Sequence, residues 1–148
     1  MKRSERWVVA GLVVLALSLT GCQQLARTHA DHSPAEVERI EGAEFSRVIL
    51  TEQAIERLAL KTDQIREQRV PRSASPRKVV PYSSLIYDPH GVTWVYTSPQ
   101  PRTFVRHKVE VDYIEGGIAV LKSGPPVGTI VVTVGVAELY GTELGVGH

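Results

Sequence analysis

The sequence predicts a mainly β fold, a small antiparallel β sandwich or barrel with one short helix, placed after a signal peptide and a spacer. Three observations lead to this prediction. Residues 79–135 form a nearly continuous series of segments rich in β-branched and aromatic residues, which favour extended strands. Turn-forming residues divide this series at short intervals. The chain has 148 residues, which allows one small domain, and residues 52–58 have the apolar spacing of a short helix.

The first 21 residues have the plan of a secretory signal peptide. Lys2, Arg3 and Arg6 precede the apolar run 7–19, which is shorter than the about 20 residues that a membrane-spanning helix needs. We therefore expect residues 1–21 to be absent from the mature protein.

The signal ends at the only cysteine of the chain. The stretch Leu19-Thr20-Gly21-Cys22 resembles a bacterial lipobox. The resemblance implies cleavage just before Cys22 and attachment of a diacylglycerol to its sulfur, and several acyl chains on one residue anchor a protein firmly to a membrane. The alternative is a small buried cysteine at the end of a signal anchor.

A lipid on Cys22 implies a membrane-tethered protein whose body lies in an extracytoplasmic space, and the resemblance implies that this space is the periplasm of a Gram-negative bacterium. Gln23 follows the cysteine, and by resemblance to lipoprotein sorting the lack of Asp there points to the outer membrane. Adaptor lipoproteins with other residues at this position work at the inner membrane, so both membranes stay open.

Residues 22–44 are predicted to be a polar spacer, because they are rich in charge and contain no aromatic side chain. Within it, Ser33-Pro34-Ala35-Glu36 has the form of a capping box, which predicts a short turn of helix. His29 and His32 are three residues apart, but two histidines without a third ligand favour a solvated spacer over a metal site.

The domain is predicted to occupy residues 45–148 and to begin with short elements. We expect a strand over 45–50, a helix over 52–58 with Thr51 as its N-terminal cap, and an extended segment over 60–70. The proline- and serine-rich residues 71–76 predict a loop.

A β hairpin is predicted over residues 79–97. Two runs with β-type composition, 79–87 and 92–97, flank the tetrapeptide Asp88-Pro89-His90-Gly91. Asp at the first position, Pro at the second and Gly at the fourth favour a type I turn.

The next strand is predicted over residues 103–111, after a connection at 98–101. Its side chains alternate, and we expect one set to face the core: Val105, His107, Val109 and Val111. The other set is expected to face solvent: Phe104, Arg106, Lys108 and Glu110.

The last elements are predicted from turns and apolar runs. Residues 118–121 form a strand, 123–128 a loop, and 129–136 a central strand, because the last run is apolar on both faces. The tail 137–144 has helical spacing only briefly.

The charge balance gives no reason to expect a nucleic-acid partner. The formal net charge is +1, and removal of residues 1–21 changes it to −1. A near-neutral protein lacks the basic surface that nucleic acids require.

Four residues that could suggest a hydrolase, Ser83, Ser84, Asp88 and His90, lie close together in the sequence. A serine nucleophile requires a strained turn, a base within reach and an oxyanion hole, and this stretch lacks that pattern. The predicted turn already accounts for Asp88 and His90. We therefore expect a binding protein rather than an enzyme, without catalytic residues or a cofactor.

Seven short stretches between residues 45 and 145 share their order and spacing with one protein family: Leu50–Ile55, Leu58–Thr62, Val80–Leu85, Thr93–Tyr96, Phe104–Arg106, Ser123–Gly135 and Ala137–Gly141. Together they resemble the periplasmic adaptor subunits, or membrane fusion proteins, of tripartite RND-type efflux pumps.

The chain differs from a full adaptor in its middle. Adaptors of this family carry a lipoyl-like domain, a long α-helical hairpin and a β-barrel there, whereas here Val70 leads through the loop 71–76 almost directly to Val79. The resemblance implies a membrane-proximal domain, built from the first and last parts of the chain, without its insertion. Loss of an insertion can leave its host intact when the ends lie close together.

The resemblance therefore implies a lipid-anchored accessory component of an RND-type efflux system that works by protein–protein binding. Its partners would be the membrane, through the lipid on Cys22, and the inner-membrane transporter or a full-length adaptor. Arg106 and Lys108 are candidate contact residues, although a solvated strand face is the commoner explanation of such charges. The alternative is a stand-alone envelope lipoprotein that binds a small ligand or a metal on an adaptor-like scaffold.

Overall fold

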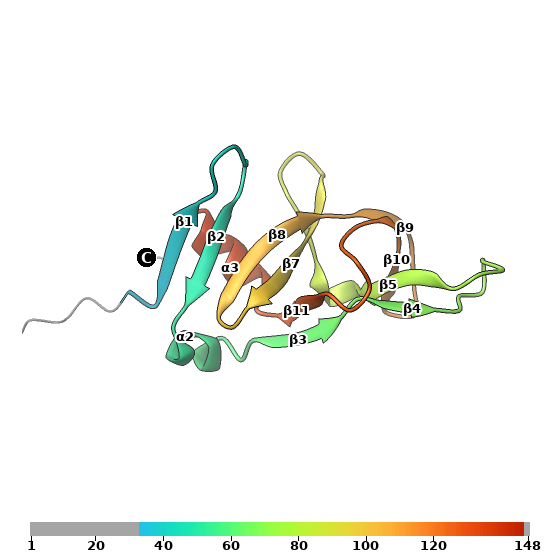
Figure 1. Cartoon of the computed structure of the whole chain (residues 1–148), viewed down its shortest axis with the longest axis horizontal. Coiled ribbons are helices and arrows are strands. Elements are labelled where there is room, and N and C mark those ends of the chain that lie inside the picture. The colour runs from blue at the N-terminus through green and yellow to red at the C-terminus, as the bar shows by residue number, and fades with distance from the viewer. Residues whose placement is uncertain (1–32, 147–148) are drawn as a thin grey trace, which may run out of the picture. The chain divides into compact units, whose positions relative to one another are not determined.

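Two antiparallel sheets make up most of the computed structural model, which describes residues 33–146, and they confirm the predicted mainly β class (Figure 1). The larger sheet has the order β1-β2-β8-β7-β11-β3, and β6 also pairs with β7. Its strands are β1 (Ala35–Arg39), β2 (Ser46–Leu50), β3 (Lys61–Gln64), β6 (Leu85–Tyr87), β7 (Thr93–Gln100), β8 (Thr103–Lys108) and β11 (Ile130–Val134). The smaller sheet has the order β4-β5-β10-β9, with β4 (Arg66–Gln68), β5 (Arg77–Pro81), β10 (Ile118–Ser123) and β9 (Glu110–Glu115).

The N-terminal strand β1 corrects the predicted spacer. The expected turn of helix after Ser33 is wrong, because Ala35–Arg39 pairs with β2 in an antiparallel register that places Val37 opposite Val48. The Ser33 hydroxyl donates to the carbonyl of Ala35 at 2.6 Å instead of capping a helix. One isolated helical turn has only marginal stability. A strand at this position instead forms backbone hydrogen bonds with β2.

The helix α2 (Glu52–Arg57) confirms its prediction. The Thr51 side chain accepts a hydrogen bond from the N–H of Ala54, as an N-terminal cap does. At the other end, the N–H groups of Ala59 and Leu60 donate to the carbonyls of Glu56 and Ile55. This is the Schellman pattern, whose left-handed position is Ala59, with a φ of +47°.

Replacing Ala59 with glycine is expected to raise the free energy of unfolding by about 1 kcal/mol, because alanine is strained in the left-handed region and glycine is not. Chemical denaturation of the two variants measures the difference. Ala74→Gly, in an exposed loop, is the matched control and should be neutral or slightly destabilising. Equal effects of the two substitutions would contradict the strain at Ala59.

The chain passes between the two sheets at four places, where the described strands are interrupted. The linkers are Ile65, the 3-10 helix η2 (Tyr82–Ser84), Val109 and the loop 124–129. The predicted strands 79–87 and 103–111 are therefore each wrong in extent, since each divides into two strands that join different sheets. Segments that bend from one sheet into another form the corners of packed β structures.

The hairpin predicted around Asp88 is confirmed for its second half. β6 pairs with β7, and the N–H of Gly91 donates to the carbonyl of Asp88 at 2.9 Å. The predicted connection at 98–101 starts too early, because β7 continues to Gln100 and the turn to β8 lies at Pro101–Arg102.

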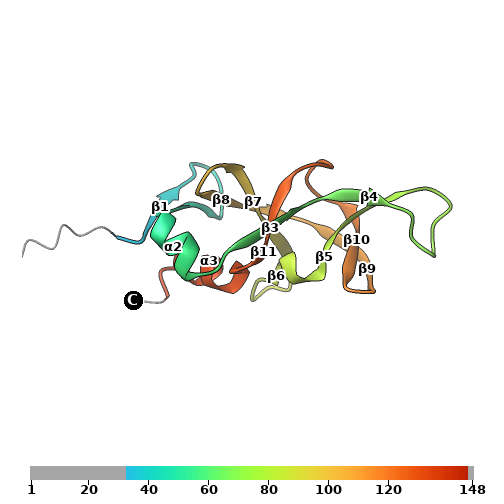
Figure 2. The same ribbon diagram turned by 90° about the horizontal axis from the view of Figure 1, so that it is seen from below.

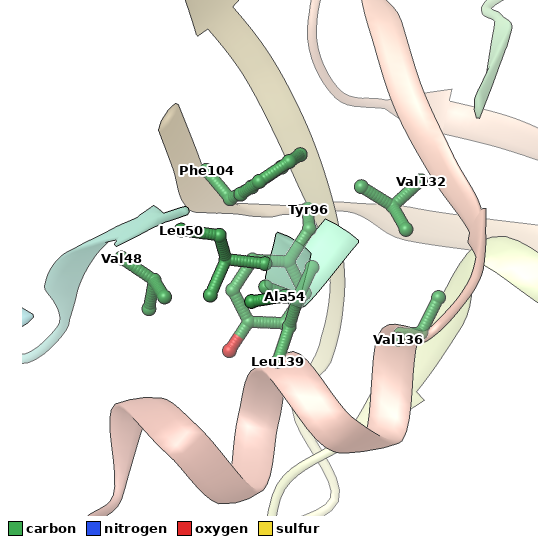
Figure 3. Packing of buried hydrophobic residues seen from close by; sticks show 8 residues of the cluster. All are labelled: Val48, Leu50, Ala54, Tyr96, Phe104, Val132, Val136 and Leu139. Atoms are coloured by element: carbon green, nitrogen blue, oxygen red, sulfur yellow. The ribbon is translucent and has the colours of Figure 1, made fainter. Parts of the chain in front are cut away.

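Two apolar cores cover opposite faces of the larger sheet. The first lies between this sheet and the helices, and Figure 3 shows its buried members: Val48, Leu50, Ala54, Tyr96, Phe104, Val132, Val136 and Leu139. The second lies between the two sheets, with Ile65, Val80, Val95, Val109, Ala119, Leu121 and Val131. Neighbouring residues Val131 and Val132 face different cores, which confirms the prediction that this strand is covered on both faces.

The helix α3 (Val136–Glu143) is longer than the brief helix predicted from the tail. Its Val136 and Leu139 are buried in the first core. Packing of this apolar side against the sheet stabilises a helix whose own spacing is weak. Strand β1 and the β4–β5 hairpin lie at opposite ends of the domain in two perpendicular views (Figures 1 and 2).

Candidate functional site

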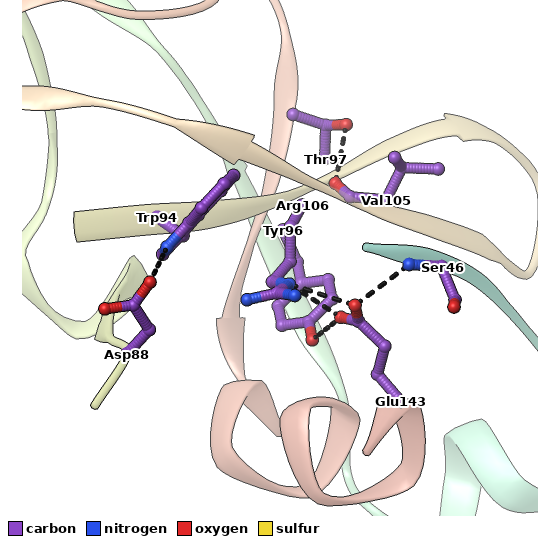
Figure 4. A network of polar contacts seen from close by, with 8 residues as sticks. All are labelled: Ser46, Asp88, Trp94, Tyr96, Thr97, Val105, Arg106 and Glu143. Atoms are coloured by element: carbon purple, nitrogen blue, oxygen red, sulfur yellow. Dashed lines mark hydrogen bonds and ion pairs between the residues drawn. The ribbon is translucent and has the colours of Figure 1, made fainter. Parts of the chain in front are cut away.

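A buried ion pair joins β8 to the end of α3 (Figure 4). The Nε of Arg106 lies 2.8 Å from a carboxylate oxygen of Glu143, and their side chains are 7% and 2% exposed. The same carboxylate accepts hydrogen bonds from the backbone N–H of Ser46, at 3.0 Å, and from the hydroxyl of Tyr96. Strands β2, β7 and β8 and helix α3 therefore meet at one carboxylate.

Aromatic rings flank the guanidinium of Arg106. Its central carbon lies 4.8 Å from the ring centroid of Trp94 and 5.2 Å from that of Tyr140, within the range of cation–π attraction. Phe45 packs edge-on against Trp94, with 5.8 Å between the centroids. Because Phe45 belongs to the first part of the domain and Tyr140 to the last, these contacts tie the two parts together.

The Tyr96 hydroxyl remains a hydrogen-bond donor in this group. Burial, and then the hydrogen bond to Glu143, raise the pKa of Tyr96 above its usual range. The carboxylate thus keeps a cation and two further donors, which compensates the loss of water around a buried charge. The arrangement holds α3 against the sheet, so we assign it a positioning role.

The sequence reasoning missed Glu143 and Tyr96. One signal was present, because a carboxylate in the last turn of a helix is unfavourable to the helix dipole and calls for a compensating cation. The sequence could not identify that cation as Arg106, because this required knowing which face of β8 is buried.

Strand β8 buries the face opposite to the one predicted. Phe104 and Arg106 are buried, whereas His107 and Lys108 are exposed. The sequence predicts that buried and exposed side chains alternate without a break from residue 103 to residue 111. The chain changes sheets at Val109, so the pattern of buried and exposed positions in β8 does not continue into β9. The prediction that Arg106 is an exposed contact residue is therefore wrong. Lys108, the other candidate contact residue, lies at the surface.

Asp88 organises the turn between β6 and β7. Its carboxylate accepts hydrogen bonds from the N–H of His90 at 2.8 Å, the N–H of Val92 at 2.9 Å and the indole N–H of Trp94 at 3.1 Å. Loss of water raises the pKa of Asp88, but these donors outweigh it and lower the pKa below its usual value. Asp88 therefore favours its ionised form in the fold.

Asp88→Asn is expected to change how stability depends on acid. A lowered pKa in the folded state stabilises the fold above the unfolded pKa, which is about 3.9 for aspartate, and this contribution is lost as the pH falls through the folded value. The thermal midpoints of wild type and Asp88→Asn should therefore differ by a constant amount between about pH 5 and 7 and converge below about pH 4.

The control for this titration is Glu67→Gln, on the exposed strand β4. It removes an exposed carboxylate that takes no part in the Asp88 turn. A midpoint difference between wild type and Asp88→Asn that stays constant to the lowest pH would contradict the role of the Asp88 charge.

Among the described residues, no hydrogen bond between two side chains joins the four residues that could suggest a hydrolase. Ser84 is fully buried in η2, and its hydroxyl finds no hydrogen-bond partner among the described residues. Ser83 and His90 are exposed. Asp88 bonds to the N–H of His90 and not to its ring.

The predicted lipidation site Cys22, together with Gln23, His29 and His32, lies outside the described residues. Within residues 33–146, no group of three His, Cys, Asp or Glu side chains is placed to hold a metal ion. Among the helices that the structure describes, none is long and apolar enough to cross a membrane.

An apolar groove of about 480 Å³ lies where α3 meets the start of β1 and the end of α2. Its lining includes Pro34, Ala35, Leu58, Ala137, Gly141 and Val146. The groove shares no residue with the ion pair, so the buried polar group and the candidate binding surface are separate features.

Two comparisons with known proteins identify no relative. No protein-family model matches the sequence, and no curated protein matches it significantly.

Proposed function

We propose that this chain is a lipid-anchored, periplasm-facing accessory component of an RND-type efflux system, which binds the inner-membrane transporter or a full-length adaptor. One observation carries the proposal: strands from the first and last parts of the domain alternate in one sheet. β2 pairs with β8, and β3 pairs with β11. By the resemblance, the membrane-proximal domain of an adaptor is built from the first and last parts of the chain, which meet in space.

The β4–β5 hairpin gives a physical reason why such a domain would survive without its insertion. Gln68 and Arg77 are opposite each other in the paired strands, so the ends of the loop 69–76 are adjacent. The resemblance locates the missing modules in this loop. A host domain tolerates removal of an insertion whose ends lie this close.

The ends of the domain fit the proposed tether. Strand β1 follows the spacer, and the β4–β5 hairpin lies at the opposite end (Figures 1 and 2). The predicted spacer and a lipid on Cys22 would tether the chain at the end of the domain that begins with β1. A tether at this end supports binding to a partner that itself stands on the membrane.

Co-purification tests the proposal. An affinity tag inserted after the loop residue Ser73 leaves both sheets and the groove free. Membranes of the native host are solubilised in mild detergent, and the captured proteins are identified by mass spectrometry. We expect an RND-type transporter or a full-length adaptor to be recovered.

Two variants make the result specific. Deletion of residues 79–136 keeps Cys22 but removes most of the β domain, and it should abolish recovery of the partner. Cys22→Ser keeps the domain but removes the thiol that would carry the lipid, and the purified chain should then lack the mass of the acyl chains. Capture of the intact chain without any efflux component would contradict the proposal and favour a stand-alone envelope lipoprotein.

A further inference from the structure

The groove at the β1 end has the exposed apolar rim of a contact surface. Val146, which lines it, is 64% exposed, and Leu144 beside it is 53% exposed. Val37 is 44% exposed and lies on the same face of β1 as the lining residue Ala35. These are three of the eight large apolar side chains that the described domain exposes, and all three belong to the segments that line the groove.

The rim is held in place by the backbone. The N–H of Val146 donates to the carbonyl of Gly141 at 2.9 Å, and the N–H of Leu144 donates to that of Tyr140 at 3.1 Å. A Cβ on Gly141 would lie 3.1 Å from the carbonyl oxygen of Val146, so glycine permits this close return of the chain. The apolar side chains are therefore presented by a folded end of α3.

We propose that this groove and its rim rest on the lipid surface that holds the anchor at Cys22. The inference rests on the proposed lipid anchoring. Ten residues, 23–32, lie between Cys22 and Ser33, the first described residue, and about 3.5 Å for each of the eleven Cα-to-Cα steps limits the span to roughly 40 Å. An anchor at Cys22 would thus keep the start of β1 within roughly 40 Å of the lipid surface.

Because the chain is tethered, a small apolar surface is sufficient for contact with the membrane. A linked second contact forms at a high effective concentration, so a rim of a few side chains that would not bind vesicles from solution can bind once anchored. Side chains of this kind enter the boundary between headgroups and acyl chains, about 5–10 Å deep.

The charge at the groove selects the type of lipid. Glu138 is the one charged side chain among the described residues that line the groove. A carboxylate is repelled by an anionic surface. We therefore assign this face to neutral, zwitterionic headgroups, and we expect added anionic lipid to weaken the contact.

The test uses tryptophan as a depth reporter in a chain coupled to vesicles. Residues 22–148 contain Cys22 as their only thiol and Trp94 as their only tryptophan. The thiol is coupled to a maleimide lipid in phosphatidylcholine vesicles, which supplies the tether whether or not the cell lipidates this cysteine. Val146→Trp places the reporter on the rim, and Val127→Trp, in the loop after β10, is the matched exposed control.

We expect lipids brominated near the headgroup to quench Val146→Trp about twofold more strongly than Val127→Trp. Adding Leu144→Gln to Val146→Trp should reduce this quenching, and an unchanged thermal midpoint would show that the fold is intact. Replacing part of the phosphatidylcholine with phosphatidylglycerol should also reduce it.

Equal quenching at the two positions would overturn the proposal, even for a chain that is firmly attached. A second pair of results would also overturn it: no quenching of the rim reporter, together with loss of transporter recovery when Leu144→Gln is purified from native membranes. The groove would then contact a protein and not a lipid surface. The mass of Cys22 in the native chain is a separate measurement, so absence of the natural anchor is distinguishable from failure of the rim to touch lipid.

Discussion

Replacing Glu143 with alanine is expected to lower the free energy of unfolding by about 3–5 kcal/mol. The substitution leaves the Arg106 guanidinium buried without its anion, and it removes the acceptor of Tyr96 and Ser46. An uncompensated buried charge is costly because the low-polarity interior cannot replace the solvation by water. Because α3 is fixed to the sheet at this carboxylate, its loss should also expose Leu139 more often.

Urea denaturation measures this change in the free energy of unfolding, and two further variants serve as controls. Glu138→Ala removes an exposed carboxylate from the same helix and should change the unfolding free energy by no more than about 0.5 kcal/mol. Joint replacement of Glu143 and Arg106 with leucine and methionine should recover part of the loss, because no charge is then left unpaired. A Glu143→Ala variant as stable as Glu138→Ala would show that the ion pair does not hold the helix.

Ile65→Ala is expected to cost about 2–5 kcal/mol. Ile65 is fully buried between the two sheets, at the point where the chain leaves β3 for β4. Its N–H donates to the carbonyl of Thr129 at 3.0 Å, and its carbonyl accepts from Gly128 at 2.8 Å. These bonds hold the side chain in the second core, so its truncation leaves a cavity that the rigid backbone cannot close.

The adjacent residue provides the control for Ile65. Gln64→Ala changes an exposed side chain on β3 and should alter stability by less than about 0.5 kcal/mol. Similar denaturation midpoints for the two variants would mean that Ile65 is not part of a shared core and that the two sheets pack more loosely than the structure indicates.

The features that the sequence predicted correctly are those with local signals. Thr51 caps α2 through the N–H of Ala54, and Asp88 and Gly91 close the turn before β7. Each of these signals acts over a few residues, so its chemistry is contained in the stretch itself. The general β class follows from the same local preferences.

The features that were missed depend on partners far away in the chain. β1 is a strand because β2 pairs with it, and the run 103–111 divides because its second half joins another sheet. Local composition carries no information on where a strand changes sheets. The same change of phase hid the buried position of Arg106, and with it the ion pair to Glu143.

The candidate functional surface was also beyond local reasoning. Pro34 and Val146 are far apart in the sequence and line one groove because α3 packs beside the first strand. The resemblance to a lipobox predicted an anchor at Cys22, but the apolar rim of the groove becomes visible only once the two ends of the described domain are brought together.

The most direct test of the account is to divide the chain within the loop between β4 and β5. The proposed adaptor-like domain requires residues 33–73 and 74–148 to form one fold, because β2, β3 and β4 pair with strands of the second segment. Expressed as separate fragments with a tag on one, they should co-purify in equal amounts and show the circular dichroism of the intact chain. If residues 74–148 fold alone with that spectrum and do not retain residues 33–73, the account is contradicted.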